Sequence, residues 1–336
     1  MHGLLRAPAL ASLALMASTV AHALTPAIIY DQGGKFDKGF NESAFVGAEK
    51  FRAESKISFL EAMATHENNA ENQIRNMIQK GADHIILIGF TFSDAVAKTS
   101  KEFPKVRFTL VDSVVEGPNV QSIVFKEHEG SYLVGMAAAY GSKTSKLGFI
   151  TAMDIPMLQA FGCGYAQGAK QVRGNIEVFT STIGTTGEAF SNPPKAALLA
   201  KKQIEKGADV VYAAAGASGL GTLRVARDTN TFAIGVDSNQ NWMLPGRVLT
   251  SMVKRIDTAV YQALTSSSKG SWKPGILKLG LKEGGVDWSL DTYNASLISP
   301  ATKAAVEQAR KNIIEGKTRV VDFREGNSCP VALTPM

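Results

Sequence analysis

The sequence predicts an α/β protein built from two similar doubly wound parallel-sheet lobes. The main observation is an internal repeat, in which residues 79–83 (Gln-Lys-Gly-Ala-Asp) are echoed by residues 205–209 (Glu-Lys-Gly-Ala-Asp). Each copy leads into an apolar stretch, which ends at Gly89 in the first half and at Gly216 in the second. Two copies of an α/β half, each of about 120 residues, imply two lobes with a cleft between them.

Two further correspondences extend the repeat. A second apolar run ends in Val-Asp-Ser in both halves, with its acid at Asp112 and at Asp237. Upstream, Phe40 and a following Gly-Ala pair are echoed by Phe161 and another Gly-Ala pair. Because the carboxyl ends of parallel strands meet at one edge of a sheet, we expect polar side chains at these ends to face the cleft.

In the first lobe, predicted strands alternate with helices, as right-handed crossovers in parallel sheets require. A Gly-rich loop, 32–39, follows the first strand, and Asn41 can cap the helix after it. The apolar strand before Gly89 is typical of a sheet covered on both faces. The predicted strands are 27–30, 57–62, 85–89, 107–111 and 120–125, and the predicted helices are 42–54, 71–80 and 94–102.

The second lobe has the same alternation. A helix over 130–140 begins it, and a strand over 248–252 is expected to return the chain to the first lobe, followed by a helix over 255–266. The other predicted strands are 147–151, 176–180, 210–214 and 232–236, and the other predicted helices are 158–172, 193–206 and 300–315. We therefore assign 24–126 plus 251–282 to the first lobe and 127–250 plus 283–336 to the second.

Residues 1–23 have the features of a cleaved signal peptide. Arg6 precedes a short apolar run over 9–20, and Ala21-His22-Ala23 is a cleavage signal. The run is too short to span a bilayer, which disfavours an N-terminal membrane anchor. No Cys follows it, so the usual bacterial lipid-anchor residue is missing. These features predict a periplasmic protein that is not lipid-anchored.

Composition excludes several function classes. The 336 residues carry a net charge of +6, but no Lys/Arg block is longer than two and no aromatic residues interleave with the basic ones. This pattern favours scattered solvated lysines over a nucleic-acid surface. The five His are scattered, so no metal site and no cofactor are expected. An exported chain could oxidise Cys163 and Cys329, and the sequence leaves their pairing open.

The candidate site consists of residues at strand ends and in neighbouring loops. Asp31, Gly89, Asp112, Gly216 and Asp237 all follow predicted strands. A single Asp at such a position is most simply a turn cap. Three at matching positions favour contacts with ligand hydroxyl or ring N–H groups, since a buried acid needs partners.

Aromatic residues occupy loops of both lobes. Phe36 and Phe40 lie beside Asp31, and Phe190 lies in the corresponding loop of the second lobe. One aromatic ring from each lobe could sandwich a flat ligand, and each stacked base face is worth roughly 1–3 kcal/mol. The alternative is that each ring folds back onto its own lobe.

Enzyme motifs are largely missing. Gly216-x-Ser218 lacks the final Gly of a nucleophile elbow, and His128-Glu129 has no second His nearby. The Gly-rich segment 216–221 departs from the order of a dinucleotide-binding fingerprint. The loop 31–37 supplies only two carboxylates, fewer than the metal loop of nucleoside hydrolases.

Several segments in combination resemble the basic membrane protein family, the substrate-binding proteins of ABC transporters related to the spirochaete purine nucleoside receptor. The resemblance covers nearly the whole chain after residue 23. The segments that carry it are 31–44 (Asp-x-Gly…Asp-x-x-Phe-Asn-Glu-Ser-Ala), 129–135 (Glu-Gly-Ser-Tyr-Leu-Val-Gly), 213–216 (Ala-Ala-Ala-Gly), 234–240 (Ile-Gly-Val-Asp-Ser-Asn-Gln) and 248–255 (Val-Leu-Thr-Ser-Met-Val-Lys-Arg).

The resemblance implies a type I periplasmic-binding fold with three crossovers and a purine nucleoside ligand. On the family pattern Phe40 and Phe190 would stack on the base, and Asn41 and Asp112 would bond its edge. Asp237 would hold the ribose hydroxyls, with Lys254 and Gly216 nearby. The family's aromatic-Asn-Asp-Pro segment reads Phe-Ser-Asn-Pro over 190–193, without the acid, which leaves ligand identity open.

The resulting functional hypothesis is a monomeric periplasmic receptor that closes around a purine nucleoside and delivers it to an ABC permease in the inner membrane. Such a protein has no chemistry of its own. One alternative is a receptor for a sugar or autoinducer, whose hydroxyls the Asp residues would bind. The other is a secreted nucleoside-cleaving enzyme.

Overall fold

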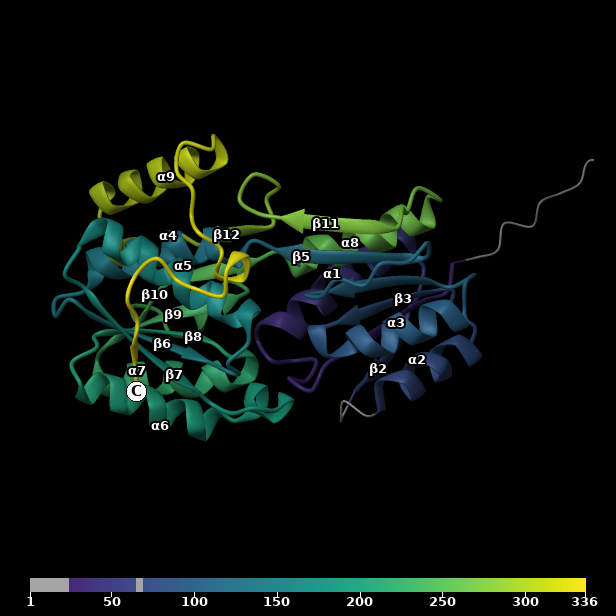
Figure 1. Cartoon of the computed structure of the whole chain (residues 1–336), viewed down its shortest axis with the longest axis horizontal. Helices are drawn as coiled ribbons and strands as arrows, with labels where there is room; N and C mark the ends of the chain where they lie inside the picture. Colours follow the sequence, from purple (N-terminus) through teal and green to yellow (C-terminus); the bar gives the residue numbers. More distant parts are fainter. Residues whose placement is uncertain (1–23, 65–68) are drawn as a thin grey trace, which may run out of the picture.

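The computed structural model describes residues 24–64 and 69–336, and this part of the chain forms two α/β lobes around two separate sheets (Figure 1). The predicted fold class is confirmed. The predicted signal peptide, 1–23, lies outside the described residues.

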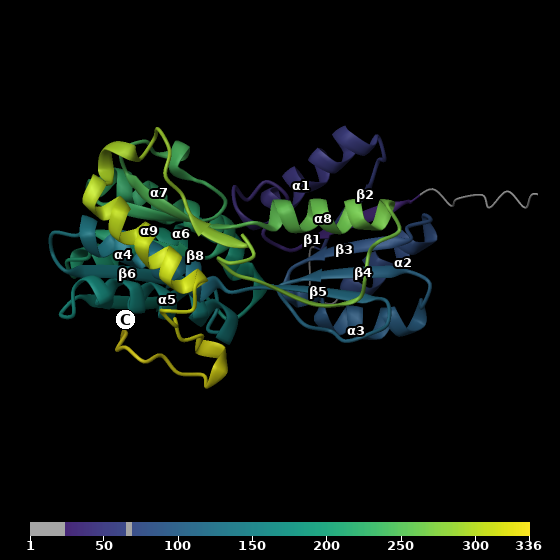
Figure 2. The same ribbon diagram turned by 90° about the horizontal axis from the view of Figure 1, so that it is seen from above.

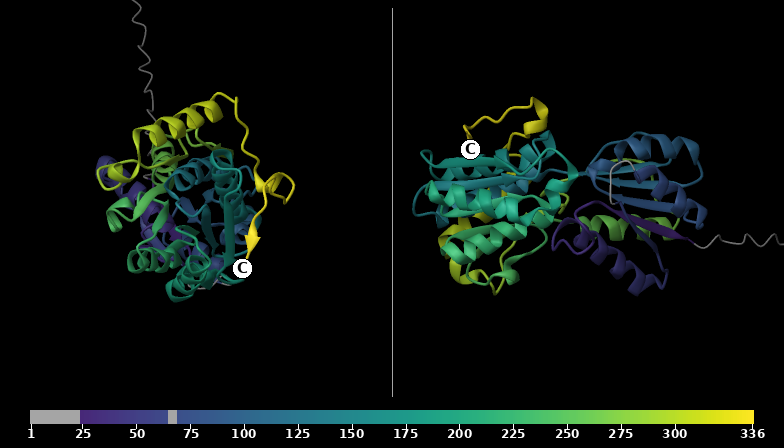
Figure 3. Two further views of the ribbon diagram at one scale, coloured as in Figure 1. Left: turned by 90° about the vertical axis from the view of Figure 1, so that its left-hand side faces the viewer. Right: turned by 90° about the horizontal axis from the view of Figure 1, so that it is seen from below.

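The first lobe contains a six-stranded sheet in the order β11-β5-β4-β3-β1-β2, in which every pair is parallel. Helices α2 and α3 cover one face and α1 and α8 the other (Figures 2 and 3). The central strands are apolar and buried on both faces, as the continuous runs predict. The strands are β1 (Pro26–Tyr30), β2 (Leu60–Met63), β3 (His84–Ile88), β4 (Arg107–Val111), β5 (Val120–Phe125) and β11 (Gly275–Leu279), and the helices are α1 (Phe40–Ser55), α2 (Ala70–Gln79), α3 (Ser93–Glu102) and α8 (Ile256–Ser268).

The second lobe contains a seven-stranded sheet in the order β12-β10-β9-β8-β6-β7-β13. Among its described pairs, β10 and β12 run antiparallel and the others parallel. Helices α4 and α5 cover one face, with α9 packed on α4, and α6 and α7 cover the other. The strands are β6 (Lys146–Thr151), β7 (Glu177–Thr182), β8 (Val210–Ala214), β9 (Phe232–Asp237), β10 (Val248–Lys254), β12 (Val286–Trp288) and β13 (Thr334–Pro335), and the helices are α4 (Glu127–Gly141), α5 (Pro156–Val172), α6 (Pro193–Glu205), α7 (Gly219–Thr229) and α9 (Pro300–Ile314).

Three segments cross between the lobes. They follow β5, β10 and β11, and the chain ends in the second lobe. The expectation that the strand near 248–252 returns to the first lobe is wrong, because β10 pairs with β9 through Val253 and lies inside the second sheet. The second crossing therefore comes after Lys254, and residues 251–254, which we assigned to the first lobe, belong to the second sheet. Antiparallel pairing with β12 completes β10 and explains why it continues past the predicted end.

The C-terminal segment is fixed to the second lobe. A short helix, η7 (Phe323–Glu325), packs against α5, and β13 adds to β7 at the edge of the sheet. A disulfide between Cys163 and Cys329 joins α5 to this segment, which settles the pairing that the sequence left open.

Glycines let α4 and α5 approach until their backbones touch. A methyl group at Gly168 would lie 1.9 Å from the carbonyl oxygen of Tyr132, and one at Gly135 would lie 2.1 Å from that of Tyr165. Only glycine, which has no side chain, fits at these two contacts between the helices. The helix pair follows directly on the first crossing, so its packing fixes where the second lobe begins relative to the first.

We predict that Gly168→Ala lowers the free energy of unfolding by about 1–3 kcal/mol, because α4 and α5 must separate to admit the methyl group. Gly174→Ala is a matched control, since a methyl group there meets nothing within 4 Å. Urea denaturation of both variants measures the difference. A Gly168→Ala variant as stable as wild type would contradict the close helix contact.

Candidate functional site

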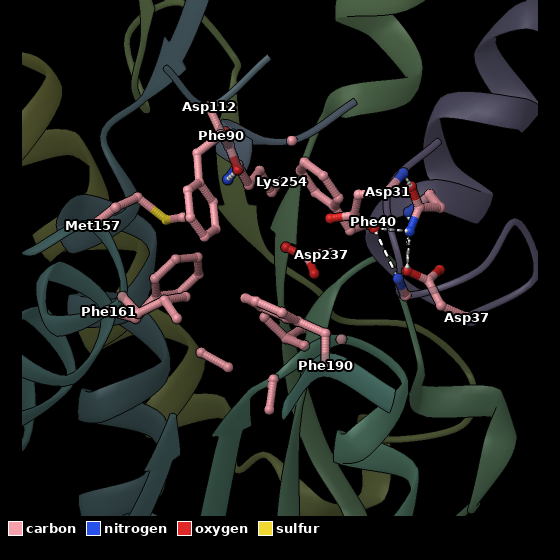
Figure 4. Close-up of a pocket in the computed structure, with 18 residues that line it drawn as sticks. Asp31, Asp37, Phe40, Phe90, Asp112, Met157, Phe161, Phe190, Asp237 and Lys254 are labelled. Carbon is pink, nitrogen blue, oxygen red and sulfur yellow. Dashed lines mark hydrogen bonds and ion pairs between the residues drawn. The ribbon is translucent and has the colours of Figure 1, made fainter. Parts of the chain in front are cut away.

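A cavity lies between the lobes, and 18 residues that line it appear in Figure 4. The structure brings all of the predicted site residues to this one cavity, although their binding roles stay predictions. Those residues are Asp31, Phe40, Asn41, Asp112, Phe190, Gly216, Asp237 and Lys254.

Residues related by the sequence repeat face each other across the cavity. Asp112 follows β4 and Asp237 ends β9, and both have a left-handed backbone, with φ of 70° and 64°. Asp is one of the few residues that adopts this conformation readily, and the same turn in each lobe carries the acid into the cleft. Gly89 and Gly216, after β3 and β8, also have positive φ and line the same cavity.

Asp31 is held by a polar cluster at the start of α1. Asn41 donates both of its amide hydrogens within the protein, to Oδ1 of Asp31 at 2.7 Å and to Oδ2 of Asp37 at 3.2 Å. Asp37 also accepts from the backbone N–H groups of Gly39, Asn41 and Glu42 and so caps α1. The other oxygen of Asp31, Oδ2, has no hydrogen-bond partner within 24–64 and 69–336. Asn41 thus orients Asp31, and its N–H groups are not free for a ligand edge.

Asp237 is buried without a partner in the described chain. The residue is 7% exposed, and neither carboxylate oxygen accepts a hydrogen bond from residues 24–64 or 69–336. Burial raises the pKa of Asp237 to about 7, and Lys254 opposes this only in part. Burial likewise raises the pKa of Asp31 to about 6, against the opposing hydrogen bond from Asn41. Both acids are therefore poised to gain from a ligand that donates hydrogen bonds to them.

Among the described residues that line the cavity, Lys254, the last residue of β10, is the one with a positive charge. Its ammonium lies 2.6 Å from Oδ2 of Asp112 and 3.1 Å from Oε1 of Glu127. Burial alone would lower the pKa of Lys254, but these two carboxylates raise it above its ordinary value. The second oxygen of Asp112, Oδ1, is buried and has no partner among the described residues. A ligand N–H would relieve that deficit.

Four aromatic rings surround the Asp237 carboxylate in Figure 4. Phe40 and Phe90 come from the first lobe, and Phe161 and Phe190 from the second. The rings of Phe90 and Phe190 are 6.2 Å apart across the cleft. The cavity is thus aromatic on both sides.

Sequence reasoning placed one aromatic wrongly near the cleft and missed others. Phe36 is 62% exposed, does not line the cavity and packs edge-on against Phe45 in its own lobe. Phe90, Met157 and Phe161 line the cavity but were not predicted. Phe161 could have been found, because it is the repeat counterpart of Phe40. Nothing in the pattern marked Phe90 or Met157.

The loop before α1 is hydrogen-bonded to the second lobe near both of its ends. The hydroxyl of Ser191 donates to the carbonyl of Gln32 at 2.9 Å. The carbonyl of Lys38 accepts from the Ser238 hydroxyl at 2.7 Å and from the Gln240 amide at 2.9 Å. These contacts describe a closed arrangement of the lobes around the cavity.

Ser218, considered as a nucleophile, holds a loop in place in the described chain. Ser218 is buried, donates to the carbonyl of Ala189 at 2.7 Å and accepts from the backbone of Asn192 at 2.6 Å, so it fixes the loop that carries Phe190. Within 24–64 and 69–336, no group of three or more His, Cys, Asp or Glu could hold a metal ion.

Comparison with known proteins assigns the family. Residues 25–320 match the family model described as ABC transporter substrate-binding protein PnrA-like. The chain belongs to this Bmp family. Family members are substrate-binding components of ABC systems, so the protein is an ABC transporter substrate-binding protein that binds a small molecule and works with a permease complex.

Individual relatives agree with this assignment. The chain is 32% identical to the ABC transporter nucleoside-binding protein BmpA of Lactococcus lactis, over 93% of this chain and 96% of that protein. A crystal structure of a solute-binding protein of an ABC transporter system from Aeropyrum pernix superposes with a TM-score of 0.83 at 25% identity, covering 90% of this chain and 95% of that one.

The expectation that the protein is not lipid-anchored is wrong. It rested on the missing Cys near residue 23, whereas an uncharacterized protein of Pyrococcus abyssi, 31% identical over 81% of this chain and 71% of its own length, is a lipoprotein, and so are two further Pyrococcus relatives. Among the described helices, none is long and apolar enough to cross a membrane.

We predict that Asp237→Asn stabilises the unliganded protein at pH 8 by roughly 2–4 kcal/mol. Asp237 has a raised pKa in the folded state, so its contribution is most favourable below pH 4 and is lost as pH rises through about 7. The neutral amide avoids that loss. The gain should vanish near pH 4, where wild-type Asp237 is protonated when folded.

Thermal unfolding at both pH values measures this effect. Asp154→Asn, at an exposed acid in the same lobe, is the control and should change little at either pH. If Asp237→Asn is no more stable than wild type at pH 8, the protein already offsets the cost of burying the ionised Asp237 carboxylate, and the prediction is wrong.

Proposed function

We propose that the protein binds a purine nucleoside in the interlobe cavity and delivers it to its permease. The observation that carries this proposal is that one cavity is lined both by aromatic rings from the two lobes and by carboxylates at strand ends. Some of the oxygens of these carboxylates have no hydrogen-bond partner in the described chain. A nucleoside offers an aromatic base to the rings and hydrogen-bond donors to the acids. The nucleoside-binding name of the Lactococcus lactis relative supports the same ligand class.

The base would lie between Phe40 and Phe190. Each belongs to a different lobe, so the stack would form as the lobes close. In the first lobe, Oδ1 of Asp112 and Oδ2 of Asp31 are acceptors without a hydrogen-bond partner in the described chain, and base N–H groups would donate to them. Asn41 then contributes indirectly, because it holds Asp31 in place.

The ribose would lie against Asp237. An ionised carboxylate can accept two hydrogen bonds, and the adjacent 2′- and 3′-hydroxyls of ribose form a matching pair. Both oxygens of Asp237 are free of partners in the described chain, which fits this role. Binding would favour the ionised form of a group whose pKa is about 7.

The charge of the cavity favours an uncharged ligand. Asp31, Asp37, Asp112 and Asp237 line it, against the single ammonium of Lys254. That ammonium is already paired with two carboxylates. A phosphate group would enter without a free cation, so we expect nucleosides to bind much better than nucleotides.

The interlobe hydrogen bonds at Gln32 and Lys38 would stabilise the closed, liganded state. The ligand contributes the differential affinity that shifts the population toward closure, and release follows when the permease favours the open form. No step of this cycle requires chemistry on the ligand.

Calorimetry with the purified protein tests the ligand class. We expect adenosine, guanosine or inosine to bind, the matching 2′,3′-dideoxynucleoside to bind at least tenfold more weakly, and the 5′-monophosphate to bind poorly, because each lost hydrogen bond to a charged acceptor is worth about 1.5–3 kcal/mol. Asp237→Ala should weaken nucleoside binding much more than free-base binding. Equal affinities for nucleoside, dideoxynucleoside and base would contradict the ribose assignment.

Two other measurements test the alternative functions. Mass spectrometry of the co-purified ligand would identify a sugar or autoinducer if the protein binds one instead. Breakdown of the nucleoside during incubation with the protein would point to the enzyme alternative.

A separate prediction concerns the base stack. Phe190→Ala and Phe40→Ala should each weaken nucleoside binding by roughly 1–3 kcal/mol, the value of one aromatic–base stack. Phe36→Ala is the matched control, because Phe36 belongs to the loop before α1 but lies outside the cavity. Unchanged calorimetric affinity in both cavity variants would rule out the sandwich.

A further inference from the structure

We propose that Arg324, which lies outside the cavity, is a positioning residue for ligand binding and acts through Glu127 on the Lys254–Asp112 pair. The proposal rests on the ligand-binding role of the cavity. Arg324 lies in η7, just beyond residue 320, where the match to the family model ends. Figure 1 shows the C-terminal segment, in yellow, running across the second lobe with its short turn near the junction with the first.

Charges alternate in sign from the cavity wall to the C-terminal segment. Asp112 contacts Lys254, Lys254 contacts Glu127 at 3.1 Å, and Oε2 of Glu127 lies 3.1 Å from Nη1 of Arg324. The side chains of Lys254 and Glu127 are each 1% exposed, and that of Asp112 is 4% exposed. Water therefore screens these interactions little, and each charge depends on its neighbours.

Arg324 also joins the two lobes. Its Nη2 donates to the carbonyl of Phe125, the last residue of β5, at 3.0 Å. Its guanidinium pairs with Asp322 on the outer side, and Asp322 lies 3.3 Å from His128. The guanidinium thus lies against the first crossing, between the end of the first sheet and the start of α4.

The segment that presents Arg324 is anchored at two places. Gln167 on α5 donates to the carbonyl of Val321 and accepts from its backbone N–H, both at 2.9 Å. Further along, Cys329 is bonded to Cys163 on the same helix. A segment fixed on both sides of Arg324 can hold the guanidinium at Glu127 with little loss of entropy on binding.

Without Arg324, two buried carboxylates would share one buried ammonium. Lys254 faces Asp112 from β10, Glu127 faces it from α4, and the charges of Asp31, Asp237 and Arg324 also act on this region. Burial raises the pKa of Asp112, Lys254 opposes this, Glu127 adds to it, and Arg324 lowers the pKa again. Loss of Arg324 would therefore favour the protonated form of Asp112. In that form one oxygen carries a hydrogen, so the two oxygens no longer both act purely as hydrogen-bond acceptors, as those of the carboxylate do.

The experiment follows the titration of the Asp112 carboxyl group by carbon NMR of the full unliganded chain, assigned with Asp112→Asn. Arg324→Gln should raise the midpoint by about half a unit or more, since a near opposite charge shifts a pKa by about 1–3 units and this one is further away. Arg324→Lys should keep the midpoint close to wild type. Arg319→Gln, which removes an exposed arginine paired with Glu325 on the same segment, should leave it unchanged.

A compensating variant separates charge balance from folding. In Glu127→Gln with Arg324→Gln, both charges disappear and Lys254 pairs with Asp112 without a second carboxylate competing for it, so the Asp112 midpoint should return toward wild type. A purely structural role for Arg324 predicts that the double variant is at least as perturbed as the single one. The Asp112 titration of the double variant can still be measured if Arg324→Gln alone fails to fold.

Calorimetry with adenosine, guanosine and inosine supplies the binding readout. Affinity in Arg324→Gln should fall about threefold or more at a pH below the Asp112 midpoint found by NMR, less at a pH above it, and recover in the double variant. An unchanged Asp112 midpoint in Arg324→Gln, or a midpoint that the double variant fails to restore, would overturn the proposal. If wild type binds none of the three nucleosides, the proposed ligand class fails, and the Asp112 titration still decides the role of Arg324.

Discussion

The burial of several carboxylates at one place is the constraint on which the rest of the cleft depends. The parallel strands of the two sheets direct their carboxyl ends toward the same cavity, and the repeat places an acid at matching ends. Burial of an unpaired charge is expensive, so each acid needs a cation, a hydrogen-bond donor or a proton. Asp37 has backbone donors, Asp112 has Lys254, and Asp31 has Asn41. Asp237 accepts no hydrogen bond in the described chain, and the charge of Lys254 offsets only part of the effect of burial on its pKa.

The same constraint links the cavity to the crossings between the lobes. Lys254 ends the strand before the second crossing, and Glu127 begins the helix after the first. The ammonium that pairs with Asp112 therefore lies at the second crossing, and the Glu127 carboxylate that it also contacts lies at the first. A change in lobe arrangement would alter the distances within this group, so closure and the electrostatics of the cavity are expected to be coupled.

Much of this could be predicted from the sequence, because the repeat and the period of apolar residues are local signals. Apolar runs such as 84–88 identified the strands, and strand ends in turn identified Asp112 and Asp237. Three features had no local signal. The placement of β10 depends on its pairing with β12, the engagement of Asn41 depends on Asp31 and Asp37, and the contact of Arg324 with Glu127 joins residues far apart in the chain. Such contacts are set by tertiary packing, which a periodicity analysis does not represent.

In the proposed binding role, an unpartnered buried acid would also provide selectivity. With a pKa raised to about 7 by burial, ionised Asp237 is expected to lower the stability of the empty protein, and a ligand hydroxyl pair would remove that penalty. A ligand of the same shape without hydroxyls would leave the penalty in place and exclude the water that partly relieves it. Sites built to bond a substrate hydroxyl reject the analogue lacking it far more strongly than apolar pockets reject a missing methylene. The instability of the empty cavity and its discrimination among ligands would then have the same physical origin, which is a charge that the fold buries and leaves for the ligand to satisfy.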